Sequence, residues 1–337
     1  MAVLQENISL KPYNTFRIET YARFFIEVFN EQELSDFFKE WNKEMPVLIL
    51  GGGSNLLFTK DYEGLIIKIS IPGIHYTEKG DEVRITAGAG VVWNDLVRFC
   101  VQKGFAGIEN LTLIPGTVGA SPIQNIGAYG VEVKDVFYSC RAFEPATGLF
   151  RIFSAADCNF AYRESIFKNE LKGRYIITSV TFSLSKEAIL HTRYGAIVDE
   201  LKRRQISQPG IADISEVVAG IRVSKLPDPS TIGNAGSFFK NPTIEKEQFE
   251  ALRSCYPDIV NFPAPGGRVK LAAGWLIEQC GFKGKTKGRT GTWKNQALVL
   301  VNHGGASGKE VYDFSEQIIN AVQVRFGVQL EREVNIF

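Results

Sequence analysis

The chain has 337 residues, a length that suggests two or three domains. Hydrophobic residues make up 45% of the chain and charged residues 22%, which excludes a disordered protein and a small disulfide-stapled fold. The 38 Lys and Arg residues nearly balance the 37 Asp and Glu residues, so no overall field draws the chain to nucleic acid or to an anionic membrane.

The cysteines and the N-terminal sequence indicate a compartment. The five cysteines form no Cys-x-x-Cys pair, which favours a reducing environment and gives no zinc, iron–sulfur or dithiol motif. The N-terminus has no basic segment followed by an apolar stretch, and no window approaches 18 consecutive apolar residues. We therefore expect a cytoplasmic protein that does not enter a membrane.

The first half of the chain predicts strands separated by glycine-rich loops. An apolar run at 47–50 leads into Gly51-Gly52-Gly53-Ser54-Asn55, which indicates a strand followed by a loop with unshielded amides. Strands are predicted at 65–69 and 83–86, around a Pro72-Gly73 turn, and an amphipathic helix follows Gly90. The neutral segment 114–130 has neither a helical nor a strand period, and a loop of this length usually has a function.

The second half predicts alternating strands and helices. A hairpin is expected at 135–153, around Pro145–Gly148, and an alternating strand at 176–184. The pattern weakens at 185–221, where we expect a domain boundary. The remaining predictions are a buried helix at 269–280 closed by Gly281, a strand at 297–301, a helix at 310–326 with a Ser307 and Glu310 capping box and a Gly327 end, and a last strand at 328–334.

Several common motifs fail. The Gly-x-Gly-x-x-Gly pattern is broken at Leu56 and at Trp93, which argues against a Rossmann dehydrogenase. A P-loop is broken at Gln279, and no Gly-x-Ser-x-Gly elbow supports a serine hydrolase. The three histidines stand far from one another and from cysteines, so no metal site is predicted.

Three clusters remain, and each has a plain structural alternative. The loops 51–55 and 114–130 could direct main-chain N–H groups at a pyrophosphate, or they are simply tight turns. Arg163, inside the apolar and aromatic segment 161–167, could pair with a ligand carboxylate or with an internal acid such as Glu164. In the segment 221–242, cations surround an Asn-Ala-Gly-Ser turn and could hold a phosphorylated ligand, or they are solvated; these are Arg222, Lys225 and Lys240.

Together these segments resemble one enzyme family, the UDP-N-acetylenolpyruvoylglucosamine reductases, also called UDP-N-acetylmuramate dehydrogenases, of bacterial peptidoglycan precursor synthesis. The resemblance covers nearly the whole chain and depends on NTFRI, LILGGGSNLLF, ENLTLIPGTVGASPIQNIGAYG, YRESIFK, KLPDP, GNAGSFFKNP, VKLAAGWLIEQCG, QALVLVN and LEREV, in this order. It implies an α+β protein, with an FAD-binding fold of the vanillyl-alcohol-oxidase-like (PCMH-type) class and a C-terminal α/β substrate-binding domain. We expect FAD-binding subdomains at 1–70, to which the strand 328–337 returns, and at 71–214, and a substrate-binding domain at 215–327.

The resemblance also implies the cofactors. Some oxidases of the wider fold attach flavin through a histidine where this chain has Ser54 and Asn55, so FAD is expected to be non-covalent. NADPH is the implied reductant: its hydride passes to FAD and then from flavin N5 to C3 of the enolpyruvyl group, which yields UDP-N-acetylmuramate. The positions that match FAD contacts are Gly51, Gly53, Ser54, Asn55, Pro115, Gly116, Gly119, Ala120, Ser121, Gln124, Asn125, Gly127 and Tyr129.

The resemblance assigns catalytic roles to three residues. Arg163 and Glu333 match the pair that stabilises negative charge at C2 and the adjoining carboxylate, and Ser237 matches the proton donor to C2. A serine hydroxyl is a weak acid and needs assistance from neighbours. Glu333 must be protonated or hydrogen-bonded, because a bare carboxylate would repel the intermediate.

The implied substrate contacts are Tyr194, Lys225, Asn241 and Gln296, with Lys225 at the diphosphate. The segment 191–195 resembles the tyrosine-bearing loop of the type I branch, which folds over bound substrate. Phe262 stands where some type I members carry a tyrosine near the uridine, so it can stack but cannot donate a hydrogen bond.

Two alternatives stay open. The first is an FAD oxidase of the same wider fold, against which Ser237 and the KLPDP to SFFKNP region argue. The second is a flavin- or UDP-sugar-binding protein without activity, which the presence of all three predicted catalytic residues disfavours. We expect a monomer whose partners are the UDP-sugar and NADPH, with no nucleic acid, membrane or metal.

Overall fold

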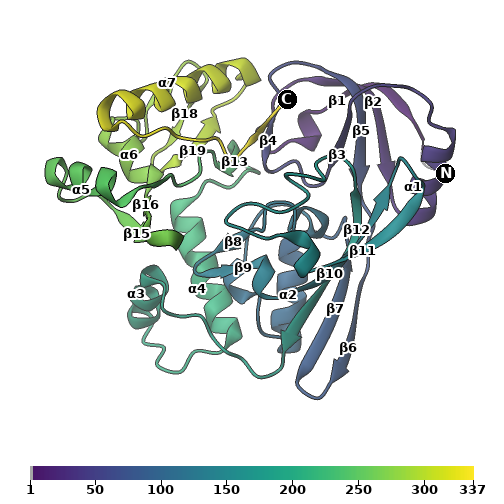
Figure 1. Cartoon of the computed structure of the whole chain (residues 1–337), viewed down its shortest axis with the longest axis horizontal. Coiled ribbons are helices and arrows are strands. Elements are labelled where there is room, and N and C mark those ends of the chain that lie inside the picture. Colours follow the sequence, from purple (N-terminus) through teal and green to yellow (C-terminus); the bar gives the residue numbers. More distant parts are fainter. Residues whose placement is uncertain (1–2) are drawn as a thin grey trace. The chain divides into compact units, whose positions relative to one another are not determined.

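The structure, a computed structural model, describes residues 3–337 and divides the chain into two compact units (Figure 1). The first unit comprises the chain up to Ile8, Ala22–Gly52 and Glu63–Arg222, and the second comprises Ser9–Tyr21, Gly53–Tyr62 and Val223–Phe337. The C-terminal unit therefore includes two short pieces from the N-terminal part of the chain. The three-part division expected from the sequence stays a prediction.

Two sheets form the frame of the first unit. One has the strand order β1 (Gln5–Ser9), β2 (Tyr21–Val28), β5 (Tyr62–Ile69) and β3 (Val47–Leu50), with β3 parallel to β5. The other is antiparallel and has the order β11 (Leu149–Ser154), β10 (Phe137–Glu144), β12 (Ile176–Ser185), β7 (Glu82–Gly88) and β6 (Ile74–Lys79). The short strand β8 (Gly127–Ala128) lies near the end of the neutral segment 114–130 and pairs with β9 (Val131–Glu132), which follows it.

Helices cover these sheets with their apolar faces. Helix α1 (Glu31–Glu40) begins at Asn30, whose side chain accepts a hydrogen bond from Glu33 N, and its Leu34 joins the core of the first sheet. Helix α2 (Trp93–Lys103) packs on the antiparallel sheet, where Trp93 meets the edge of Phe182 at 5.7 Å between ring centroids. Helices α3 (Gly195–Arg203) and α4 (Ile211–Lys225) bury their own small apolar cluster.

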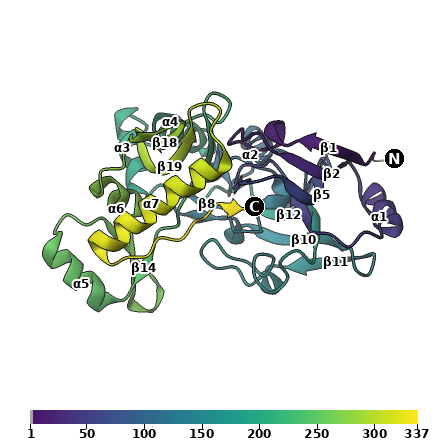
Figure 2. The ribbon, with the colours of Figure 1, turned by 90° about the horizontal axis from the view of Figure 1, so that it is seen from above.

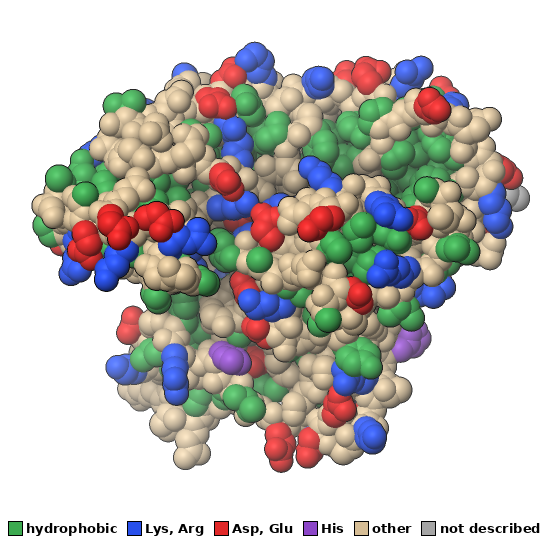
Figure 3. Space-filling model, in the orientation of Figure 1, with side chains coloured by type: hydrophobic (Ala, Val, Ile, Leu, Met, Phe, Trp, Pro, Cys, Tyr) green, Lys and Arg blue, Asp and Glu red, His purple; other side chains and the backbone are tan. Residues whose placement is uncertain are grey.

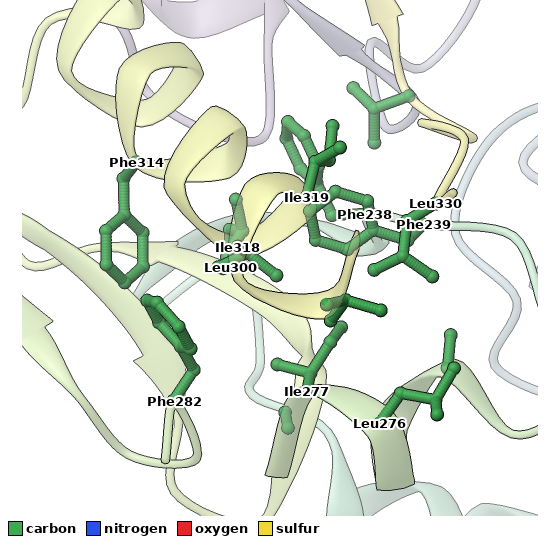
Figure 4. Close-up of a cluster of buried hydrophobic side chains, with 14 of the residues drawn as sticks. Phe238, Phe239, Leu276, Ile277, Phe282, Leu300, Phe314, Ile318, Ile319 and Leu330 are labelled. Atoms are coloured by element: carbon green, nitrogen blue, oxygen red, sulfur yellow. The ribbon is translucent and has the colours of Figure 1, made fainter. Parts of the chain in front are cut away.

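The second unit is built on a four-stranded sheet with the order β13 (Gly233–Ser237), β19 (Gln296–Asn302), β18 (Thr290–Trp293) and β17 (Thr286–Lys287). Helices α6 (Ala273–Gln279) and α7 (Gly308–Phe326) pack on it, and in Figure 4 Phe314 and Ile318 of α7 point toward Phe282 and Leu300. A smaller sheet has the order β14 (Thr243–Ile244), β16 (Val269–Leu271) and β15 (Asn261–Pro263), next to α5 (Lys246–Cys255). The last strand, β20 (Asn335–Ile336), pairs in parallel with β4 (Leu56–Leu57).

Most predicted elements are confirmed. The strands at 47–50, 65–69, 83–86, 176–184 and 297–301, the hairpin at 135–153 and the helix after Gly90 are all present. The helix at 310–326 is α7, its Ser307 and Glu310 capping box is formed, and Gly327 ends it with φ 66°. In these segments the spacing of apolar residues agrees with the face that each helix or strand buries.

Two predicted elements need correction, and several elements were not predicted. The segment 269–280 begins as strand β16, and only its second part is the helix α6. The predicted strand 328–334 makes a single bridge, Phe239 with Arg332, and regular pairing starts only at β20. Strand β6 follows the Pro72-Gly73 turn and was not predicted. Helices α3 and α4 were not predicted either; α3 and most of α4 lie in the region 185–221, where the sequence pattern weakens.

The surface carries both signs of charge. On the face shown in Figure 3, Lys and Arg side chains are interspersed with Asp and Glu, in keeping with the formal net charge of +1. Within residues 3–337, every helix is too short or too polar to cross a membrane.

Candidate active site

Two glycine-rich loops of the first unit lie against each other. A Cβ atom at Gly51 would lie 2.5 Å from the Thr117 hydroxyl oxygen, and one at Gly52 would lie 3.0 Å from the Gly116 Cα. The second loop is fixed to the start of α2, because Trp93 N donates to the carbonyl of Gly116 at 3.0 Å. Glycine is needed here because the two backbones approach too closely for a side chain.

These loops present unshielded backbone donors. Among the described residues, the N–H groups of Gly51, Gly52 and Gly116 have no hydrogen-bond acceptor. Adjacent free N–H groups on small residues form a concave site for phosphate oxygens, with no need for a cationic side chain. The residues present therefore fit the pyrophosphate of FAD.

The end of the first glycine loop belongs to the second unit. Gly53 has φ +63°, its carbonyl accepts a hydrogen bond from Thr15 N at 3.0 Å, and a Cβ there would collide with the carbonyl of Tyr13. Asn14 shapes this contact: its side-chain amide donates to the carbonyls of Leu10 and Ile18 at 2.7 and 3.0 Å. The NTFRI segment thus serves to hold the loop.

Asn55 links the predicted FAD loop to the C-terminal segment. Its side-chain amide donates to the carbonyl of Glu333 at 3.3 Å, and its own carbonyl accepts from Asn335 N at 3.2 Å. A predicted cofactor residue and a predicted catalytic residue are therefore in direct contact within the second unit.

The long neutral loop is held from within. Asn125 is fully buried with φ 44°, and its side-chain amide donates to Glu132 Oε2 and to the carbonyl of Ala161, both at 3.0 Å. The hydroxyl of Ser121 donates to the carbonyl of Val118 at 2.7 Å. These donors are used inside the protein, so a contact of Asn125 with FAD would have to involve its main chain.

Arg163 is positioned by main-chain carbonyls of this loop. Its Nη2 donates to the carbonyl of Gly127 at 2.7 Å and its Nη1 to that of Asn125 at 3.4 Å. The residue itself has φ 57°, and its carbonyl accepts from Lys168 Nζ at 2.9 Å. Two main-chain carbonyls therefore fix the direction of the guanidinium.

A second arginine lies near Arg163. Arg222, on α4, donates a hydrogen bond to the hydroxyl of Tyr129, and within residues 3–337 its buried Nε has no acceptor. Burial lowers the pKa of Arg222, Tyr129 opposes the shift, and the positive charge of Arg163 adds to it. Burial raises the pKa of Tyr129, and the positive charge of Arg222 opposes this rise. The first unit thus assembles two cations and a tyrosine hydroxyl, which form an anion-binding arrangement.

The sequence grouped Arg222 with Lys225 and Lys240; in the structure Arg222 and Lys225 both lie on α4, and Lys240 follows β13. No local pattern of the sequence indicates that α4 packs against Tyr129, so only the fold reveals where Arg222 lies. Tyr194 joins the same group, because its ring meets that of Tyr129 edge-on at 5.4 Å.

Asn110 is a further residue that the sequence did not single out. It is fully buried, and its side-chain amide donates to the carbonyls of Tyr129 at 3.2 Å and His191 at 2.8 Å. The nearby Thr112 hydroxyl shares a 2.8 Å hydrogen bond with Ser215 of α4. The ENLTL segment therefore ties the neutral loop to the loop that carries Tyr194.

Ser237 stands on an irregular strand of the second unit. The register of β13 against β19 shifts between Asn234 and Ser237, and Gly236 there has φ 68°. Asn234 holds this irregularity: its side-chain oxygen accepts from Gly236 N at 3.0 Å, and its amide donates to the carbonyl of Ile232 at 3.0 Å and to that of Pro227 at 3.3 Å. The next residue, Phe238, accepts from Glu333 N at 2.8 Å, so the segments of both predicted catalytic residues lie side by side.

The predicted substrate residues of the second unit also gather around a few main-chain groups. Asn241 Oδ1 accepts from Ala273 N at 3.0 Å, and Gln296 Oε1 lies 2.9 Å from where a Cβ of Gly274 would stand. Asn295, next to Gln296, donates to the carbonyl of Ser224 at 2.9 Å, which sets the position of Lys225. Tyr194 belongs to the first unit, and Phe262 lies partly exposed on β15.

Two family models match most of the chain. Residues 228–337 match the C-terminal domain of UDP-N-acetylenolpyruvoylglucosamine reductase, and residues 22–152 match an FAD binding domain. The expected combination of an FAD-binding fold with a C-terminal substrate-binding domain is thereby confirmed.

Proteins of the same name are similar over the full length of the chain. The UDP-N-acetylenolpyruvoylglucosamine reductase of Flavobacterium johnsoniae is 48% identical over 335 residues, and that of Pseudomonas aeruginosa is 46% identical over 336 residues; each comparison covers 99% of both chains. The crystal structure of the reductase from Thermus caldophilus has the same fold, with a TM-score of 0.69, 23% identity and full coverage of both chains. The chain therefore belongs to the UDP-N-acetylenolpyruvoylglucosamine reductase family of FAD-containing oxidoreductases.

Proposed function

We propose that this protein reduces the enolpyruvyl group of UDP-N-acetylenolpyruvoylglucosamine to give UDP-N-acetylmuramate, with NADPH as the source of hydride. Bound FAD would supply the hydride-transfer chemistry between the two substrates. The observation that supports this proposal most directly is the pairing of the Ser237 and Glu333 segments, which are almost a hundred residues apart in the chain.

FAD would be held mainly by backbone groups. The free N–H groups of Gly51, Gly52 and Gly116 would bind its pyrophosphate, and the neutral loop up to Tyr129 would line the isoalloxazine ring. We carry over Gly53, Ser54, Asn55, Pro115, Gly119, Ala120, Ser121, Gln124, Asn125 and Gly127 as further contacts of the non-covalent cofactor.

Arg163 and Arg222 would bind the substrate carboxylate, on which negative charge grows during the reaction. Removing one oriented donor to such a charge typically costs about 100- to 1,000-fold in rate. Arg163 is oriented by two carbonyls, and the buried Nε of Arg222 would gain an acceptor. The resemblance assigns the stabilisation of the same charge to Glu333 as well, as a hydrogen-bonding carboxyl.

Ser237 would deliver the proton to C2. The Asn234 contacts fix the main chain on which the hydroxyl stands, and proton transfer requires such a fixed donor. Glu333, whose main chain pairs with the strand of Ser237, would assist this weak acid.

Lys225, Asn241 and Gln296 would bind the UDP part of the substrate. Lys225 offers the charge for the diphosphate, and the two amides offer hydrogen bonds of fixed direction. Tyr194 would close over the ligand as in type I members, supported by its contact with Tyr129.

An anaerobic titration tests the proposal. The purified flavoprotein receives one equivalent of NADPH, and then one equivalent of UDP-N-acetylenolpyruvoylglucosamine, while its visible spectrum is recorded. We expect NADPH to bleach the flavin and the UDP-sugar to restore its colour. Colour that returns only with oxygen would instead favour an oxidase of the same wider fold, and a protein that takes up no flavin would refute the proposal. The monomeric state, the cytoplasmic location and the absence of nucleic-acid binding stay predictions.

A further inference from the structure

The chain that follows α7 turns back and runs beside the helix, as Figures 1 and 2 show. Arg332 lies on this returning segment and contacts α7 in three ways. Its Nε donates to the Ser315 hydroxyl at 2.9 Å, its Nη2 donates to Glu316 Oε1 at 2.7 Å, and its guanidinium carbon lies 4.3 Å from the ring centroid of Tyr312. One side chain therefore ties the segment to three residues on one side of the helix, Tyr312, Ser315 and Glu316.

The backbone on either side of Arg332 pairs with the strand that carries Ser237. Glu333 N donates to the carbonyl of Phe238 at 2.8 Å, and Lys240 N donates to the carbonyl of Glu331 at 2.9 Å. Phe239 and Arg332 are thus directly opposite each other in an isolated antiparallel bridge. Because this bridge is not continued as a ladder, few backbone hydrogen bonds hold the register of Glu333.

Adjacent side chains of an extended segment point to opposite faces, so Arg332 can hold α7 while Glu333 faces away from that helix. The contact with Glu316 is a charge-assisted hydrogen bond, and together with the Tyr312 hydroxyl it lowers the pKa of Glu316 below its ordinary value. The Arg332 side chain is 17% exposed, which reduces competition from solvent. An arginine suits this position because its planar fork serves Ser315 and Glu316 at once and stacks on an aromatic ring.

We propose that Arg332 is a positioning residue for the reduction of the enolpyruvyl group: by tying the returning segment to α7, it fixes Glu333 against the Ser237 strand. This inference rests on the proposed function, in which Glu333 and Ser237 act in the same step. It assigns Arg332 to the half-reaction that consumes the UDP-sugar, and not to the reduction of the flavin by NADPH.

The test measures both half-reactions of the FAD-loaded protein separately by anaerobic stopped-flow absorbance. In Arg332→Met we expect flavin reduction by NADPH at the parental rate and reoxidation by UDP-N-acetylenolpyruvoylglucosamine slowed about 10- to 100-fold, as for a misplacement of about 1 Å. The pH profile of reoxidation should shift, because Glu333 changes its surroundings. Arg332→Lys should recover little of the rate, since an ammonium cannot bond Ser315 and Glu316 in the same fork.

Two further variants keep the test informative should Arg332→Met fold poorly. Glu316→Ala removes one partner of Arg332 at a partly exposed position and should slow reoxidation less than Arg332→Met. Lys309→Met removes a surface ion pair with Asp313 on the same helix, at 2.7 Å, and should leave both half-reactions unchanged. Parental reoxidation in both Arg332→Met and Glu316→Ala, or an equal loss in both half-reactions, would overturn the proposal.

Glu333→Gln separates this inference from the function on which it rests. Slow reoxidation in Glu333→Gln together with parental reoxidation in Arg332→Met would refute the positioning role alone. Parental reoxidation in Glu333→Gln would refute the catalytic role proposed for Glu333, and with it the reason for positioning it.

Discussion

Replacement of Asn234 by leucine tests how the strand that carries Ser237 is held. Asn234 is 2% exposed, and its side chain makes three hydrogen bonds, to Gly236 N and to the carbonyls of Ile232 and Pro227. Leucine has nearly the same shape but makes none of them. At about 1 kcal/mol for each bond, the free energy of unfolding should fall by about 3 kcal/mol.

We also expect the replacement of Asn234 by leucine to slow the reaction. Gly236 keeps φ 68° next to Ser237, and without the Asn234 oxygen nothing else in the described structure accepts its N–H. The Ser237 hydroxyl would then sample several positions, and we expect reoxidation by the UDP-sugar to slow at least about tenfold. Urea unfolding followed by circular dichroism measures the stability, and anaerobic stopped-flow measures the rate.

Two variants sharpen this experiment. Asn261→Leu removes one main-chain hydrogen bond of 3.0 Å in the same unit and should cost about 1 kcal/mol or less. Asn234→Asp keeps the acceptor but places a carboxyl against two carbonyl oxygens, which favours the protonated acid and raises its pKa in the folded state. The native state then binds more protons than the unfolded chain, so the stability of Asn234→Asp should fall as the pH rises above about 4. A free energy of unfolding within about 0.5 kcal/mol of the parent in Asn234→Leu would refute the reasoning, because that is the size of an ordinary surface substitution.

Further predictions concern the reaction, the ion pairs and the glycine loops. Ser237→Ala should leave flavin reduction by NADPH intact and slow reoxidation by the UDP-sugar about 100- to 10,000-fold in stopped-flow assays; an unchanged rate would exclude the proton-donor role. Burial raises the pKa of Glu27, but hydrogen bonds from Lys68 and Ser70 outweigh it and hold the pKa below the ordinary 4.5. The stabilisation is therefore present above that pH and lost as the pH falls through the folded pKa, so Glu27→Gln should destabilise the protein by less than about 1 kcal/mol at pH 7, and the difference should vanish in acid thermal melts. Gly52→Ala should lower the FAD content per polypeptide in visible spectra, because its Cβ would press on the backbone of the facing loop; full flavin content would show that the loops can separate freely.

Local sequence patterns predict those helices and strands in which the spacing of the apolar residues matches the face that is buried. The helix α7 has an apolar stripe, a capping box and a terminal glycine, and all three features appear in the structure. In contrast, α4 combines polar residues with apolar ones that pack on the neighbouring helix and on Tyr129, so its period alone does not reveal it. The segment 269–271 was wrongly joined to α6, because an apolar run can be a short buried strand or the start of a buried helix.

The segment 328–334 failed for another reason. Its alternation of apolar and charged residues is typical of a strand, and Leu330 and Val334 are indeed buried. Alternation indicates which side chains are buried. A strand also needs a neighbouring extended segment that forms hydrogen bonds with it along its length. Here the partner runs alongside only around Phe239, so a single bridge forms.

The sequence singles out Arg163, Ser237 and Glu333 because each has distinctive chemistry and stands in a distinctive motif, and their roles stay predictions. The residues that hold them were not predicted. Asn110 and Asn234 act on carbonyl groups that only the fold brings within reach, and Arg222 lies close to Arg163 through the packing of α4. No repeating pattern in the sequence indicates such tertiary hydrogen bonds.

Buried asparagines connect these observations. The described part of the chain contains five asparagines that are less than 5% exposed, and each of them bonds main-chain groups of a loop or an irregular strand; they are Asn14, Asn110, Asn125, Asn234 and Asn302. Irregular backbone leaves N–H and carbonyl groups without ladder partners, and an asparagine offers two donors and an acceptor from one short side chain. Loops that must expose free amides to a cofactor, or a hydroxyl to a substrate, cannot be held by their own ladders. Irregular main chain at the candidate site needs hydrogen bonds from side chains, which explains why asparagines rather than apolar residues hold it. Replacing any of these asparagines should therefore affect ligand binding or catalysis as well as stability.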